Sequence, residues 1–212
     1  MLPDLPLFMD INSFARATPW LHGLIVVYTT YGEVLFAVLL AAGLWVARGS
    51  GDARVMAGAV WAPLGMLCAL VINQPISDAV AEVRPCRALP GVLVLAHCGT
   101  DFSFPSDHAT MAGAVAAGVL VVTRRLLAWI AVVAALLMAC SRVYVAAHYP
   151  HDVLAGLLIG STVSLVGWLL VRGVLTRVVT ALHSTRLRPL LNSAPLAPHR
   201  SDLVGSDPVR PG

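Results

Sequence analysis

The sequence predicts an all-α integral membrane bundle with five transmembrane helices and an interfacial helix at its N-terminus. Of the 212 residues, 58% are hydrophobic and 12% are charged, which is about half the charged share usual in soluble domains. The mean hydropathy is +0.81. Five apolar stretches are also long enough for a helix to cross a bilayer, which takes about 20 residues. Lipid is therefore the expected solvent, and the length allows a single domain.

The elements follow one another in a simple order. Residues 1–19 alternate apolar residues with Asp, Asn and Pro, so we expect a short helix over about Ile11–Ala17 that lies on the membrane surface. A transmembrane domain is expected over residues 20–178. Residues 179–212 are rich in Pro, Ser, Arg and Gly, a composition typical of a disordered tail. The predicted spans are Trp20–Ala47, Ala53–Ala79, Ser106–Thr123, Leu126–Ala147 and Asp152–Leu175.

The arginines predict the orientation of the bundle. The chain has no lysine, and its arginines gather at the turns on one side of the predicted membrane domain. Those that mark this side are Arg48, Arg54, Arg124, Arg125, Arg172, Arg177, Arg186 and Arg188. Because arginine-rich loops stay in the cytoplasm, the opposite side, with the loop at residues 81–104, is expected to be extracytoplasmic. The formal net charge of +3 is small, and arginines placed in this way do not form a nucleic-acid-binding surface.

Three polar clusters interrupt the apolar chain, and all lie on the expected extracytoplasmic side. In chain order they are Glu82–Arg87, Phe104–His108, and Ser141-Arg142 followed by His148 and Asp152. Ionisable groups at a membrane boundary are costly, so they are functional candidates. A lone histidine at the end of a span is more often a packing residue, but the set as a whole favours a chemical role.

These residue types suit a phosphate-handling site. The guanidinium groups of Arg84 and Arg142 match phosphate oxygens and stay charged. Free backbone N–H groups at the start of the third span, together with the helix dipole, favour an anion. A histidine can accept a phosphoryl group or act as a general acid, so His108 and His148 can divide those tasks. Asp152, four residues after His148, can hold the tautomer of its imidazole.

The order and spacing of these residues resemble the three signatures of the type 2 phosphatidic acid phosphatase (PAP2) superfamily, over roughly residues 10–175. The matching segments are Arg84-Pro85, Pro105-Ser106-x-His108 and Ser141-Arg142-x5-His148-x3-Asp152. The resemblance implies a helical phosphatase that needs neither metal nor cofactor. It also implies a phosphohistidine at His148, oriented by Asp152, with His108 as the acid that later activates water. Arg84, Ser106 and Arg142 would bind the phosphoryl oxygens.

Two departures from the signatures point to a branch of the family. The usual lysine of the first signature is Ser77 here, and Arg87 is expected to replace its charge; the usual glycine of the second is Asp107. With Asn73 and the His148-Tyr149-Pro150 turn, these features resemble the bacitracin-resistance undecaprenyl diphosphate phosphatases. That branch implies hydrolysis of an undecaprenyl or decaprenyl diphosphate to the monophosphate. It places the enzyme in a bacterial plasma membrane, with an extracytoplasmic site that recycles the cell-wall lipid carrier.

Other functions stay open from the sequence alone. A lipid phosphate monoesterase would act on phosphatidate, phosphatidylglycerol phosphate or a prenyl-phospho-sugar, and a lipid phosphotransferase would share the histidine intermediate. A lipid transporter or an inactive scaffold is the alternative outside enzymes, although the intact histidine pair argues against a scaffold. The roles of Glu33 and Asp107, and the oligomeric state, are also open.

The four cysteines carry a limited prediction. They show no CxxC and no Cys/His spacing, which argues against a zinc site. Cys86 and Cys98 share the outer loop, where an oxidising compartment permits a disulfide. Two buried thiols are the alternative.

Overall fold

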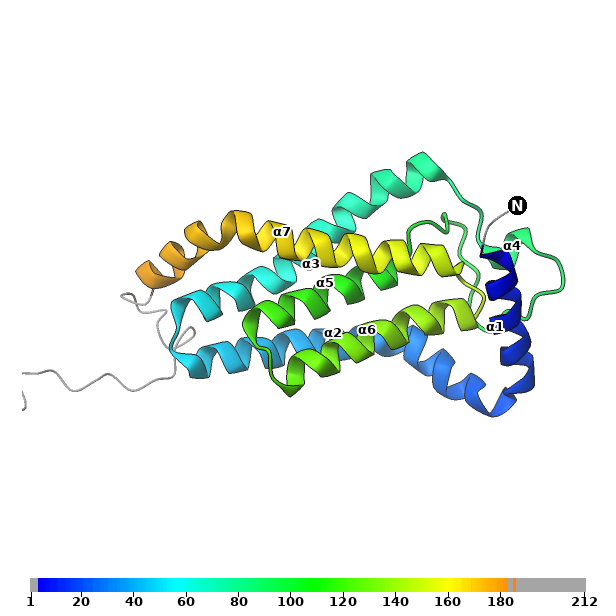
Figure 1. Ribbon diagram of the computed structural model, residues 1–212, viewed down its shortest axis with the longest axis horizontal. Coiled ribbons are helices and arrows are strands. Elements are labelled where there is room, and N and C mark those ends of the chain that lie inside the picture. Colours follow the sequence, from blue (N-terminus) through cyan, green and yellow to red (C-terminus); the bar gives the residue numbers. More distant parts are fainter. Residues whose placement is uncertain (1–3, 183–184, 186–212) are drawn as a thin grey trace, which may run out of the picture.

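The expected all-helical architecture is confirmed by the computed structural model, which describes residues 4–182 and 185. Within these residues there are helices and no strand. The elements are α1 (Leu5–Ala17), the 3-10 helix η1 (Pro19–Leu21), α2 (His22–Ser50), α3 (Ala53–Val80), α4 (Pro85–Ala88), α5 (Asp107–Val122), α6 (Leu126–Tyr144) and α7 (Pro150–Leu182). The long helices run side by side, while α1 lies across one end of the bundle, close to α4 (Figure 1).

Four of these helices, α2, α3, α6 and α7, are long and apolar enough to cross a membrane. The remaining expected span, α5, has 16 residues, fewer than the roughly 20 that a bilayer requires. It is also the most enclosed helix, since it contacts α2, α3, α6 and α7, and 11 of its residues are buried. Its neighbours therefore shield α5 from lipid along most of its length.

The ends of the helices follow from local chemistry. Gly51 adopts a left-handed conformation (φ 68°) after α2, which glycine does without steric cost. Asp52 then caps α3, because its Oδ1 accepts a hydrogen bond from the backbone N–H of Arg54 at 2.7 Å. At the far end of the chain, α7 continues to Leu182. The expected disordered tail thus begins with four helical residues, and its remainder, apart from Thr185, lies outside the described residues.

The N-terminal helix is longer than the sequence indicated, and it is fixed to the outer loop. It begins at Leu5 rather than near Ile11 and buries Phe8, Asn12 and Ala15. The Asn12 amide exchanges two hydrogen bonds with the backbone of Leu93, at 2.9 and 3.0 Å. These bonds satisfy a buried polar side chain and hold α1 against the loop that precedes α5.

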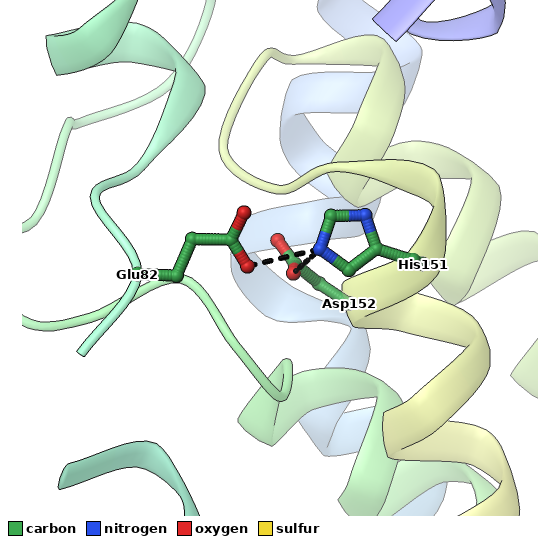
Figure 2. A group of neighbouring side chains, drawn as sticks. All are labelled: Glu82, His151 and Asp152. Atoms are coloured by element: carbon green, nitrogen blue, oxygen red, sulfur yellow. Dashed lines mark hydrogen bonds and ion pairs between the residues drawn. The ribbon is translucent and has the colours of Figure 1, made fainter. Parts of the chain in front are cut away.

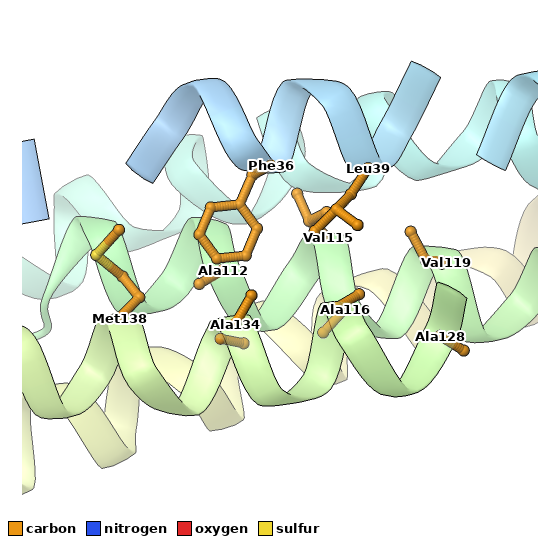
Figure 3. Packing of buried hydrophobic residues seen from close by; sticks show 11 residues of the cluster. Phe36, Leu39, Ala112, Val115, Ala116, Val119, Ala128, Ala134 and Met138 are labelled. Carbon is orange, nitrogen blue, oxygen red and sulfur yellow. The ribbon is translucent and has the colours of Figure 1, made fainter. Parts of the chain in front are cut away.

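Small side chains allow the central helices to approach closely. Figure 3 shows Phe36 and Leu39 of α2 packed on the alanines and valines of α5 and α6. Between α5 and α7 the contact is closer still. A Cβ at Gly160 would lie 2.0 Å from the carbonyl oxygen of Thr110, and one at Gly113 would lie 2.5 Å from that of Leu157. Glycine at such positions lets helix backbones meet in a membrane protein.

We expect Gly160→Ala to lower the thermal unfolding temperature of the detergent-solubilised protein, because the new methyl group would press on the backbone of α5. Overpacking of this kind typically costs about 1–3 kcal/mol. Gly173→Ala is the matched control in the same helix, since nothing lies within 4 Å of its Cβ position. Because alanine favours a helix by up to about 1 kcal/mol over glycine, this control should not lower the unfolding temperature. An unchanged unfolding temperature for Gly160→Ala would contradict the close contact.

Candidate active site

The three polar clusters meet at one end of the bundle, where α1 and α4 lie (Figure 1). The loop between α3 and α5 supplies the first cluster and runs to the second at the start of α5. The last turn of α6 and the turn into α7 supply the third. The backbone N–H of Ser106 donates to the carbonyl oxygen of Asp152 at 3.2 Å, so the second and third clusters are joined directly.

His148 is buried, with 1% of its surface exposed, and both ring nitrogens have partners. Nδ1 lies 2.8 Å from the carbonyl oxygen of Ser103, and Nε2 lies 2.9 Å from Nη1 of Arg84. A guanidinium can only donate, so Nε2 accepts and Nδ1 carries the proton. Burial lowers the pKa of His148, and the charges of Arg142 and Arg84 lower it further against the opposing effect of Asp152. The ring is therefore neutral, with its lone pair directed at an arginine.

Asp152 is fully buried, and it is connected to His148 mainly by hydrogen bonds that both residues form with Ser103. Its Oδ2 accepts hydrogen bonds from the Ser103 hydroxyl and from the backbone N–H of Tyr149 at 2.8 Å. The direct separation from Nδ1 of His148 is 3.6 Å, longer than an ordinary hydrogen bond. Ser103 thus binds both residues, the carboxylate by its hydroxyl and the imidazole by its carbonyl.

Arg84 is held by Asp101, a residue that the signatures do not include. Its Nη2 lies 2.6 Å from Oδ2 of Asp101 and its Nε 3.2 Å from Oδ1, while Nη1 also donates to the carbonyl oxygen of Ala147. Burial alone would raise the pKa of Asp101, but the hydrogen bonds and charge of Arg84 outweigh it and hold that pKa below its usual value. The paired carboxylate orients the arginine toward His148.

His108 and Arg142 face the same region from α5 and α6. Nε2 of His108 lies 3.3 Å from Oε1 of Glu33, so the carboxylate of Glu33 faces this histidine. Nη1 of Arg142 donates to the Thr29 hydroxyl at 3.1 Å. Its Nε is buried and has no hydrogen-bond partner among the described residues.

At the start of α5, Ser106 and Asp107 differ in what they contact. Ser106 is buried, and within the described part of the chain its hydroxyl has no hydrogen-bond partner. Its backbone N–H is already engaged by α7, so an anion at this helix start would meet the later N–H groups instead. Oδ1 of Asp107 accepts from the amides of Asn73 at 2.7 Å and Gln74 at 3.2 Å. Asp107 therefore ties α5 to α3.

Arg87 is not brought into this group. It is exposed and donates from Nη1 to the carbonyl oxygen of Thr100 at 2.9 Å. The reason is the short helix α4, which a disulfide between Cys86 and Cys98 joins to the later part of the loop. The structure thus contains the disulfide, one of the two alternatives that the sequence left open, and turns Arg87 outward.

A second polar group lies directly beside Asp152 (Figure 2). Nε2 of His151 is 2.9 Å from Oε2 of Glu82 and 3.1 Å from Oδ1 of Asp152, and its Nδ1 is 2.9 Å from Oδ2 of Asp4. Glu82, His151 and Asp152 offer three ligand atoms within 4.8 Å of one another, a spacing that could hold a metal ion. The sequence contains no local signal for this group, because Asp4 and Glu82 lie 147 and 69 positions before His151.

Two further site residues, Asp101 and Ser103, were not predicted from the sequence. Asp101 and Ser103 directly precede the second signature, and their proximity to it is the one local signal that could have drawn attention to them. At the opposite end of the bundle, a cavity of about 700 Å³ is lined by Arg54, Arg172 and Arg177 with their neighbours. None of the candidate site residues lines that cavity.

Fold and site together define a multi-pass membrane protein whose arginines and histidines meet at one end of an apolar helical bundle. A family model described as the PAP2 superfamily matches residues 58–175. The chain belongs to this superfamily and is a phosphatase at that level, which confirms the resemblance of its three signatures.

Two curated relatives extend over most of the chain. An undecaprenyl-diphosphatase of Sulfolobus acidocaldarius is 29% identical over 76% of this chain and 75% of its own length. The undecaprenyl-diphosphatase BcrC of Bacillus subtilis is 32% identical over 72% of this chain and 76% of its own length.

Solved structures share the fold. The crystal structure of Aquifex aeolicus LpxE has a TM-score of 0.63 at 26% identity, covering 78% of this chain and 94% of that one. A transmembrane PAP2-type phosphatidylglycerolphosphate phosphatase of Bacillus subtilis has a TM-score of 0.55 at 21% identity, covering 88% of this chain and 92% of that one. The second likeness concerns the fold alone.

The disulfide predicts a pattern of thiol labelling. Under denaturing but non-reducing conditions, we expect a maleimide to label two of the four cysteines, Cys68 and Cys140, which are free and exposed. After reduction, all four should react, since Cys86 and Cys98 are then released. Intact-mass spectrometry counts the labels. Four labels before reduction, in protein isolated from an oxidising compartment, would contradict the bond.

Proposed function

We propose that this protein hydrolyses a polyprenyl diphosphate to the monophosphate through a phosphohistidine at His148. The observation that carries the proposal is the state of that ring. Its Nδ1–H is held by Ser103 and its Nε2 lone pair faces Arg84 at 2.9 Å. A neutral, buried imidazole with a fixed tautomer beside an arginine is suited to attack an anionic phosphorus.

In the first step, Nε2 of His148 forms a bond to the terminal phosphorus as the bond from phosphorus to the bridging oxygen breaks. His108 gives its proton to that oxygen, and the polyprenyl monophosphate leaves. The ring of His148 becomes positively charged, and Asp152, 3.6 Å from Nδ1, stabilises this charge. In the second step, His108 takes a proton from water, the water oxygen bonds to phosphorus, and the P–N bond breaks to release inorganic phosphate.

Unused donors support the position of the phosphoryl group. The hydroxyl of Ser106 and the Nε of Arg142 are both buried without a hydrogen-bond partner among the described residues. Buried polar atoms are rarely left in this state, and a catalytic role is one of the recognised reasons for it. With Arg84, these groups would neutralise the phosphoryl oxygens, and most of the catalysis would come from such positioning and charge. We do not extend this role to Arg87, which faces outward.

The membrane arrangement fits this chemistry. We propose that α5 is the fifth transmembrane element, shortened because its neighbours enclose it, and that the site opens at headgroup depth on the extracytoplasmic side of a bacterial plasma membrane. The lipid tail of the substrate could then remain in the bilayer. The diphosphate substrate is supported by two relatives named undecaprenyl-diphosphatase and by the branch features of the signatures.

We expect purified protein to release phosphate from undecaprenyl diphosphate faster than from phosphatidate or a prenyl monophosphate, with EDTA present throughout. His148→Ala should reduce this rate by at least about 10³-fold, because the nucleophile is lost. His97→Ala, an exposed histidine at the same end of the bundle, is the control and should keep the wild-type rate. Colorimetric phosphate detection measures both variants.

The other outcomes separate the alternatives. A preference for a monophosphate with the same loss in His148→Ala would keep the mechanism and change the substrate. Phosphate transfer to an added alcohol instead of water would indicate a phosphotransferase. Activity that survives His148→Ala would refute the proposed nucleophile, and absence of any phosphate release would favour a transporter or a scaffold.

The orientation can be tested in intact cells. In a Cys68→Ser, Cys140→Ser background, we expect a membrane-impermeant maleimide to label Asp78→Cys, which lies at the same end as the site. Arg124→Cys, an exposed position in the turn between α5 and α6, should react only after the membrane is permeabilised. The reverse pattern would place the site in the cytoplasm.

A further inference from the structure

The group of Asp4, Glu82, His151 and Asp152 carries more negative charge than it can balance. Three carboxylates surround one imidazole, and the side chains of Asp4 and Glu82 are only 17% and 16% exposed. Asp152 is fully buried. Arg84, an arginine of the neighbouring site, is already paired with Asp101. Buried carboxylates need a compensating cation or a proton, and a protonated His151 would supply one charge for three.

The spacing of the ligand atoms suits a metal ion. Nε2 of His151 lies 2.9 Å from Oε2 of Glu82 and 3.1 Å from Oδ1 of Asp152, and all three atoms lie within 4.8 Å of one another. Two donors that are each about 2.1 Å from one ion, at a right angle, are about 3 Å apart. Figure 2 shows the three side chains directed at a common point from the loop after α3 and from the first turn of α7.

Asp4 binds His151 on the side away from the proposed ligands. Its Oδ2 accepts from the backbone N–H of His151 at 2.8 Å and lies 2.9 Å from Nδ1. Without a metal, Nε2 donates to Oε2 of Glu82; when a metal displaces that proton, the ring keeps its proton on Nδ1 and its Nε2 lone pair faces the metal. A carboxylate behind a metal-binding imidazole is the usual arrangement in metalloproteins, and it fixes both the tautomer and the ring plane.

An unpartnered oxygen points to the same place. Oδ1 of Asp152 is buried, and among the described residues it has no hydrogen-bond partner. Its other oxygen, Oδ2, is fully engaged by Ser103 and Tyr149. This oxygen lies 3.1 Å from Nε2 of His151 without a hydrogen bond to it, so a cation between the two atoms would satisfy both.

We propose that Glu82, His151 and Asp152 bind one divalent transition-metal cation such as Mn²⁺ or Zn²⁺, with water as the remaining ligands. One imidazole with two carboxylates is a donor set that these ions accept. The ion binds the Oδ1 side of Asp152, whereas His148 lies on the Oδ2 side, so the metal does not contact the phosphoryl group. It joins the loop after α3 to α7 and fixes the Asp152 carboxylate. The metal site does not depend on the proposed reaction, because that reaction is expected to proceed when EDTA has removed the metal.

The test uses full-length protein in detergent, stripped with EDTA, dialysed and titrated with MnCl₂ alone. We expect one Mn²⁺ per chain by calorimetry and elemental analysis, and a rise in thermal unfolding temperature with added Mn²⁺. Glu82→Gln and His151→Gln should weaken binding at least tenfold. Asp4→Asn, which keeps all three ligands, should weaken it by roughly 10–100-fold. The matched control is Glu33→Gln, another carboxylate beside a histidine at this end of the bundle, which should bind as the wild type does.

A spectroscopic measurement on the wild-type protein identifies the ligand even if a variant fails to fold. Pulsed electron paramagnetic resonance of Mn²⁺ bound to the wild type should show coupling to one imidazole nitrogen, and this coupling should vanish in His151→Gln. Wild-type protein that binds no stoichiometric Mn²⁺ would overturn the proposal. Binding without nitrogen coupling, or binding unchanged in Glu82→Gln, would overturn it as well. In each of those cases the group is a protonated histidine held among three carboxylates.

Discussion

The close contact between the first turns of α5 and α7 determines the geometry of the whole site. A Cβ at Gly156 would lie 2.6 Å from the carbonyl oxygen of Ser106, and the Ser106 N–H donates to the carbonyl oxygen of Asp152. Two backbones at this distance cannot shift independently. The contact therefore fixes the start of α5, which carries His108, relative to the start of α7, which carries Asp152. The remaining site residues are arranged around this rigid pair.

Burial in a poorly solvated region makes each charge depend on a specific partner. Arg84 is 7% exposed and is balanced by Asp101, while its Nη1 is directed at His148 and at the carbonyl oxygen of Ala147. Such a guanidinium keeps the imidazole neutral, because a protonated ring would face a positive charge. An arriving phosphate adds negative charge beside Arg84, which is paired with Asp101, and beside Arg142, whose Nη1 donates to the Thr29 hydroxyl. The electrostatics of the site are thus organised for a bound anion.

Much of this arrangement could be predicted because its signals are local. The apolar runs indicated the helices, and the four-residue spacing between His148 and Asp152 indicated that the two lie close together at the start of α7. What could not be predicted depends on contacts between distant segments. No local pattern places Asp101 on Arg84 or Asp4 on His151, which are separated by 147 positions. Arg87 lies exposed directly after the disulfide-bonded Cys86, and the 16-residue α5 contacts four other helices; both depend on segments distant in the sequence.

Asp152 connects the two polar groups at this end of the molecule, and its two oxygens have different tasks. Oδ2 belongs to the network of Ser103 and His148, and Oδ1 faces His151. Any cation on the Oδ1 side, a proton on His151 or a metal ion, draws electron density from the carboxylate and limits its rotation. Asp4, which precedes α1, and Glu82, which follows α3, then act on His148 through a single carboxylate. The position of the N-terminal helix across the bundle end is therefore part of how the buried histidine is oriented.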